Sequence, residues 1–212
     1  MSTPPPARSV KIPDDERGAW SSDRPRRGAP PRREADITVR CRVLEPSDRM
    51  RYSPGSLVVV VCPAAEQRER FAERVVEERG ALLTRGKVRR LLAGRVPDDE
   101  VEARAAELLE AAVRKRLDAG ESVVVTAEGL DAAERERYVR PAAAARRPRH
   151  VILLEAARDQ VSEEDRPVLN ELRRALDAGE LGAEGFQTAL RLGGASIAEV
   201  KRILFRPPPQ DG

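Results

Sequence analysis

Residues 57–72 read Leu57-Val58-Val59-Val60-Val61-Cys62-Pro63-Ala64-Ala65-Glu66-Gln67-Arg68-Glu69-Arg70-Phe71-Ala72. The first five side chains are all apolar, which is typical of a strand covered on both faces of a parallel sheet. A short loop follows, and then a stretch with helical spacing in which Phe71, Val75 and Val76 share one face. The stretch therefore predicts a buried strand, a loop and a helix, the repeating unit of parallel α/β sheets.

The rest of the chain continues this alternation. Further strands are expected at 37–44, 81–84, 122–126, 150–155 and 188–192, and the first of them should have one wet face because its polar and apolar residues alternate. Helices are expected at 67–79, 87–93, 98–119, 132–145 and 163–178, the fourth with a possible break near Pro141; residues 196–204 form a final helix or strand end. This order predicts an α/β fold of three layers with a mostly parallel, five-stranded sheet, preceded by an edge strand and linker at 36–53.

The two ends differ in composition from this central domain, which is expected at 36–205. Residues 1–35 hold seven of the 17 prolines, eight basic residues and five acidic ones, so the excess of 8 − 5 = +3 equals the net charge of the whole chain. An Arg/Pro-rich stretch with few aliphatic residues predicts a disordered tail. This tail could bind a protein or a nucleic-acid partner. Aromatic residues, which stack on bases, are only 3% of the chain, and this argues against the nucleic acid. A second, Pro-rich tail is expected at 206–212.

Several function classes are excluded by what the chain contains. His150 is the single histidine, which argues against a histidine metal site or a Ser-His-Asp triad. Cys41 and Cys62 form no motif. The N-terminus shows no apolar run of signal-peptide length, and the longest apolar run, 57–63, is too short to cross a membrane. We therefore expect a cytoplasmic protein without a membrane partner.

The strand, loop and helix at 57–72 have the layout of a phosphate-binding loop, yet no glycine is present in it. Such a loop needs glycines so that backbone N–H groups can converge on the anion. Over about 54–204, four segments in order resemble the P-loop kinases of the polynucleotide-kinase-like and zeta-toxin-like group, often labelled AAA-family ATPases. These segments are 62–72, with its Phe71-Ala72 exit, 83–94, 119–130 and 184–200.

The resemblance implies a P-loop NTPase-like fold and assigns positions for a site. The degenerate phosphate loop comprises Pro63, Ala64, Ala65, Glu66, Gln67, Arg68 and Glu69. Cys62, Ala65 and Gln67 stand at the family's glycine positions, Arg68 at its lysine and Glu69 at its Mg²⁺-binding Ser/Thr. Gly86 stands where the family has its substrate-activating Asp, Thr126 where it has a metal-associated Asp, and Gly129 where it has an Asn. Candidate phosphate-binding side chains for a substrate are Arg89, Arg90 and, in a shortened lid, Arg158.

Three functional hypotheses follow. The first is a catalytically impaired P-loop kinase-like protein, a pseudoenzyme that serves as a binding or regulatory module and needs no cofactor or metal. The second is an active ATP-dependent kinase with an atypical loop, in which Arg68 and Glu128 act and Glu69, Glu128 or Glu155 recruits Mg²⁺. The third is a nucleic-acid-associated adaptor that acts through residues 1–35.

Overall fold

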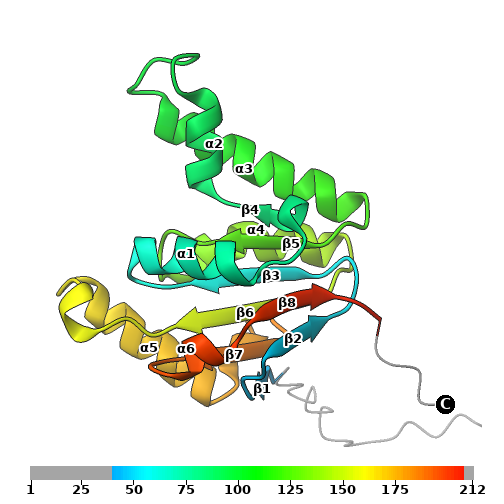
Figure 1. Cartoon of the computed structure of the whole chain (residues 1–212), viewed down its shortest axis with the longest axis vertical. Coiled ribbons are helices and arrows are strands. Elements are labelled where there is room, and N and C mark those ends of the chain that lie inside the picture. Colours follow the sequence, from blue (N-terminus) through cyan, green and yellow to red (C-terminus); the bar gives the residue numbers. More distant parts are fainter. Residues whose placement is uncertain (1–39, 208–212) are drawn as a thin grey trace, which may run out of the picture. The chain divides into compact units, whose positions relative to one another are not determined.

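A computed structural model of the chain describes residues 40–207. Their main sheet has six strands, all parallel, in the order β1 (Arg42–Leu44), β7 (Thr188–Leu192), β6 (Arg149–Leu154), β3 (Leu57–Val61), β5 (Val123–Thr126) and β4 (Leu82–Leu83) (Figure 1). The predicted α/β fold with a parallel sheet is confirmed. The predicted tail at 1–35 lies outside the described residues, as does most of the predicted tail at 206–212.

The sheet has one strand more than the five expected. The edge strand predicted at 37–44 appears as β1, which pairs with β7 so that Arg42 lies opposite Thr188. Its backbone is fixed further by Cys41, whose N–H donates to the carbonyl of Gly179 at 2.8 Å. The strand therefore completes the main sheet, because it finds an open edge with free backbone groups.

The centre of the sheet is β3, the stretch from which the fold was predicted. All five of its side chains are fully buried, and its backbone pairs with β5 on one side and β6 on the other. Valines are well suited to this position because β-branched side chains pack closely on a pleated surface. This central place puts the residues after Val61 at the middle of the sheet's carboxyl edge.

Helices cover both faces of the sheet. One face is packed by α3 (Val101–Asp118), α4 (Ala132–Ala144) and α5 (Asp165–Asp177). α4 runs without a break through Pro141, which removes the alternative of an interrupted helix. The other face is packed by α1 (Ala65–Val75), while α2 (Arg85–Leu92) lies against α3.

A two-stranded ribbon completes the face that carries α1. It consists of β2 (Arg49–Tyr52) and β8 (Arg202–Phe205), paired in parallel, with Arg49 opposite Arg202. β2 falls in the expected linker, and residues 196–204 divide between the short helix α6 (Ser196–Glu199) and β8. The ribbon buries Met50, Tyr52 and Ile203 in the same cluster as Phe71 of α1, so it takes the place of a helix in this layer.

The single histidine has a structural position in this layer. The ring of His150 lies 4.5 Å from that of Tyr52, and its Nδ1 is 2.8 Å from the hydroxyl of Thr188. Burial, together with the nearby charge of Arg149, lowers the pKa of His150 to about 4. The side chain is therefore neutral at physiological pH and belongs to the core.

Candidate functional site

At the carboxyl edge of the sheet, the chain connections that leave β3 and β6 lead to opposite sides. The chain leaves β3 through α1 toward β4, on the β5 side, whereas it leaves β6 toward β7 on the opposite side. Open α/β sheets bind ligands outside the carboxyl ends of the strands at such a switch point. The residues that follow Val61 and Leu154 are therefore expected to form a ligand site.

The loop after β3 is shorter than expected. Only Cys62, Pro63 and Ala64 separate β3 from α1, which begins at Ala65 instead of residue 67. Residues 65–69 contain no glycine and are mostly good helix formers, so they wind into the first turns of the helix. The expected phosphate loop of 63–69 is thus largely helical.

The side chain of Arg68 turns back onto this short loop. Its Nη1 donates to the carbonyl oxygen of Cys62 at 3.3 Å, and the residue is only 4% exposed. Its Nε is buried without a hydrogen-bond partner among the described residues and lies 3.9 Å from Glu69 Oε1. The cation of Arg68 is therefore engaged by the protein's own backbone.

Two of the three glutamates that were candidates for metal binding, Glu69 and Glu128, also have internal partners. Glu69 Oε1 accepts a hydrogen bond from the hydroxyl of buried Thr126 at 2.7 Å. Glu128 pairs with Arg85 at 2.7 Å and with Arg89 at 3.1 Å. Arg89 is held in addition by Glu102, and this hydrogen bond is the main reason why the pKa of Arg89 is raised.

These residues surround a cavity of about 460 Å³ on the β5 side of α1. It brings together many of the predicted positions, and its lining consists of Ala65, Glu66, Arg68, Glu69, Gly86, Arg89 and Glu128. Sequence reasoning missed Arg85, the main partner of Glu128, although it lies next to Gly86 in a segment that the resemblance covers. Positions 85 and 128 are far apart in the chain, so no local sequence pattern predicts that they pair.

Glu155, at the end of β6, lies at the centre of a second ion-pair network. It accepts hydrogen bonds from Arg173 of α5 and, at 2.7 Å, from Arg191 of β7, while its carbonyl accepts from Gln67 Nε2 at 3.1 Å. Burial opposes ionisation of Glu155, but the two arginines outweigh burial and hold its pKa below the usual range. Glu155 thus links α1, α5 and β7 at the switch point.

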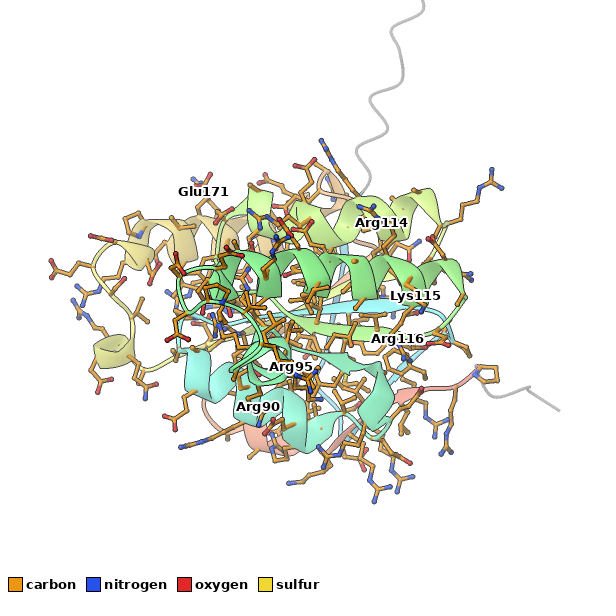
Figure 2. The ribbon with its side chains drawn as sticks, turned by 90° about the horizontal axis from the view of Figure 1, so that it is seen from above. Arg90, Arg95, Arg114, Lys115, Arg116 and Glu171 are labelled. Carbon is orange, nitrogen blue, oxygen red and sulfur yellow. The ribbon has the colours of Figure 1, made fainter. Side chains whose placement is uncertain are left out.

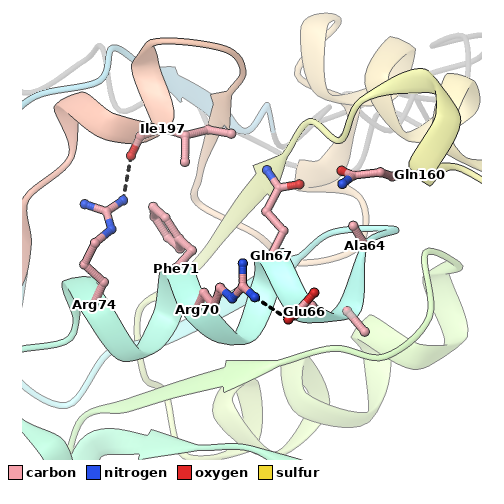
Figure 3. A pocket seen from close by; sticks show the side chains of 9 residues that line it. Ala64, Glu66, Gln67, Arg70, Phe71, Arg74, Gln160 and Ile197 are labelled. Atoms are coloured by element: carbon pink, nitrogen blue, oxygen red, sulfur yellow. Dashed lines mark hydrogen bonds and ion pairs between the residues drawn. The ribbon is translucent and has the colours of Figure 1, made fainter.

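A larger cavity of about 720 Å³ opens on the other side of α1 (Figure 3). Its wall includes Gln67, Arg70, Phe71, Arg74 and Gln160, with Ile197 from α6. Arg74 crosses from α1 to α6, since its guanidinium donates to the carbonyls of Ile197 and Val200 at 2.7 and 2.8 Å. The cavity thus has a mixed polar and apolar lining next to the first turn of α1.

The remaining predicted positions lie apart from these two cavities. Arg90 is on the exposed side of α2 and forms no ion pair within residues 40–207 (Figure 2). Arg158 belongs to a short 3₁₀ turn, Arg158–Gln160, and lines a different cavity beside α5. The structure therefore does not bring Arg89, Arg90 and Arg158 together into one substrate-binding group.

Comparisons with known proteins give little further information. No protein-family model matches the chain, and neither does any curated protein. One solved structure that is similar is described as a "putative kinase" from Chloroflexus aurantiacus, with 16% sequence identity and a TM-score of 0.45, over 69% of this chain and 88% of that chain. A similarity of this strength shows neither a shared site nor a shared activity.

The described residues lack two features that would mark other classes of site. None of the helices within 40–207 is long and apolar enough to cross a membrane. In the same part of the chain, no group of three or more His, Cys, Asp and Glu side chains is arranged as a metal site. The parallel sheet and the cavities beside α1 together define an α/β protein with a ligand-sized cleft at the switch point of its sheet.

Proposed function

We propose that this chain is a catalytically impaired P-loop kinase-like protein that acts as a binding or regulatory module. The observation that carries the proposal is the hydrogen bond from Arg68 to the carbonyl of Cys62. Phosphoryl transfer depends on a free cation and backbone amides that surround the phosphates. Here the cation is turned into the protein, and the segment that would wrap the phosphates is the first turn of α1.

A magnesium triphosphate does not fit the residues present at this edge. Glu66 and Glu69 place two carboxylates on the first turns of α1, facing the cavity that a triphosphate would enter. These carboxylates would repel the phosphates of a bound nucleotide. They also stabilise the N-terminus of α1, as a bound phosphate would otherwise do. Glu69 and Glu128, the nearest oxygen ligands for Mg²⁺, are both bound by other side chains.

The cavity of about 720 Å³ is the proposed ligand site of the module. Its volume is in the range of pockets that bind small molecules, and Phe71 and Ile197 offer apolar surface beside Gln67 and Gln160. The protein would bind the ligand there without catalysing a reaction of it. Its position next to Glu155 and α6 would couple it to α5, β7 and the β2–β8 ribbon.

Isothermal titration calorimetry with MgATP and MgGTP tests the first half of this proposal. We expect no saturable heat up to millimolar nucleotide, and no transfer of labelled phosphate to the 5′-hydroxyl of DNA or RNA. Micromolar nucleotide binding together with such transfer contradicts the proposal. In that event Arg68→Ala should abolish turnover, while Arg174→Ala, at an exposed position of α5 that lines neither cavity beside α1, should retain it.

A fragment screen read by amide NMR tests the second half. Binders are expected to shift the amides of Gln67, Phe71 and Gln160. Binders that shift only residues remote from α1 would show that the module uses another surface, and would overturn the assignment of this cavity.

A further inference from the structure

A separate cavity of about 360 Å³ lies between α5 and the segment that follows β6. It shares no lining residue with the two cavities beside α1. Three of its seven lining residues are arginines and none is acidic; the seven are Ala156, Arg158, Val161, Arg166, Leu169, Asn170 and Arg173. Such a concentration of one charge in a cavity indicates a site for an anion.

Two elements of the chain build this cavity. α5 contributes one face through Arg166, Leu169, Asn170 and Arg173, which recur at the spacing of neighbouring turns. The opposite wall is the 3₁₀ turn that begins at Arg158. Leu169 and Val161 are 1% and 6% exposed, so the floor is apolar and fixed in the core.

The arginines of the cavity differ in how well they are neutralised. Arg173 donates to Glu155 and to Asn170 Oδ1, so its charge is balanced. Among the described residues, Arg166 pairs only with Glu163, at 3.4 Å, whose side chain is 91% exposed and therefore strongly hydrated. The Nε of Arg166 is buried with no hydrogen-bond partner among the described residues.

Arg158 is the least neutralised of the three. Its guanidinium forms no ion pair and no hydrogen bond within residues 40–207. Several carboxylates lie near it in the sequence, but none lines the cavity: Asp159, Glu163 and Glu164 are exposed, and that of Asp165 accepts a hydrogen bond from the Ser162 hydroxyl at 2.7 Å. Arg158 and Arg166 therefore line an apolar-floored cavity whose lining contains no carboxylate.

We propose that this cavity binds a phosphate monoester. The dianion would lie between Arg158 and Arg166, where the buried Nε–H of Arg166 gains the acceptor that it lacks. Arginine suits this role because its planar fork donates two parallel hydrogen bonds to phosphate oxygens. The organic part of the ester would rest on Leu169 and Val161, and a volume of about 360 Å³ admits a small ester only.

Titration of the full-length protein with phenyl phosphate, followed through arginine Nε–Hε NMR signals at low salt, tests this inference. We expect saturable binding with a downfield shift of the Arg166 signal. Arg158→Gln and Arg166→Gln should each weaken binding by about tenfold, the loss expected for one charge-assisted contact. Arg166→Lys, which keeps the charge but not the fork, should give an intermediate loss.

Arg174→Gln is the matched control, because Arg174 lies on the same helix, is 75% exposed and does not line the cavity. It should bind phenyl phosphate as the unmodified protein does, and thermal unfolding of all variants checks that each is folded. Equal weakening in Arg174→Gln, no weakening in the two rim variants, or no saturable binding overturns the proposal. Inorganic phosphate bound as tightly as phenyl phosphate overturns the assignment of an organic ester.

Discussion

The guanidinium of Arg68 and the carbonyl oxygen of Cys62 are joined across the start of α1, at 3.3 Å, in a part of the protein that solvent scarcely reaches. The bond closes a ring of seven residues, 62–68, over the loop between β3 and α1. It satisfies a backbone acceptor at the end of the central strand and holds a charged side chain in the interior. Arg68 therefore has a structural role whatever the cleft binds.

Arg68→Ala should lower the free energy of unfolding by about 1–3 kcal/mol, because it leaves the buried Cys62 carbonyl without its partner. Urea denaturation followed by circular dichroism measures this. Arg70→Ala is the control: among residues 40–207, Arg70 pairs only with Glu66, both are largely exposed, and the change should stay within about 0.5 kcal/mol. Equal stability of the two variants would show that the Arg68 bond contributes nothing.

Thr126→Val should destabilise the protein by about 1 kcal/mol, since it removes the hydroxyl that donates to Glu69 without changing the volume of a buried side chain. A double-mutant cycle with Glu69→Ala isolates the pair, because alanine leaves the hydroxyl without its acceptor, and we expect a coupling energy above about 0.5 kcal/mol. Additive effects of the two substitutions would mean that the hydroxyl and the carboxylate do not interact in solution.

Glu155→Gln should cost about 2 kcal/mol, because Arg173 and Arg191 share this carboxylate and its side chain is only 16% exposed. The control is Glu171→Gln on the outer side of α5 (Figure 2), where the pair with Arg174 is 3.9 Å apart and exposed. That substitution should have no measurable effect. Chemical denaturation at pH 7 compares the two, and similar midpoints would be inconsistent with the network at the switch point.

His150 should make the protein less stable below neutral pH. Its pKa is about 4 in the folded protein and about 6.5 when unfolded, so the unfolded state binds the extra proton between these values. Its stabilising contribution is therefore complete above pH 6.5 and falls by about 2 kcal/mol between pH 7 and pH 5. His150→Asn, which keeps a polar atom for Thr188, should remove this part of the pH dependence. A variant with the same loss between pH 7 and 5 would assign that loss to other groups.

The alternation of strands and helices could be read from the sequence because each buried strand is a short, continuous apolar run. β3 is the clearest case, and its bounds at Leu57 and Val61 agree with the prediction. β2 could not be recognised, since Arg49-Met50-Arg51-Tyr52 is short and half charged. Only its pairing with β8, far away in the sequence, makes it a strand.

The candidate site was predictable in its location but not in its contacts. Residues 62–69 contain none of the glycines that a phosphate-binding loop needs, and the structure adds that the segment is helical from Ala65. The partners of Glu69, Glu128 and Glu155 come from other elements, so only the fold determines them. Arg158 was assigned to the same cleft, but it lies beside α5 instead, because the segment after β6 leads it there.

The ribbon of β2 and β8 has a consequence for how the chain folds. Its two strands come from opposite ends of the described region. Met50 and Tyr52 are therefore synthesised early, but they are buried only after Ile203 has been synthesised and has packed against them. A contact between such distant segments closes a long loop and forms late in folding. A nascent chain therefore exposes the apolar surface beneath this ribbon, beside α1, until the last strand arrives, and during this interval it most needs protection from aggregation.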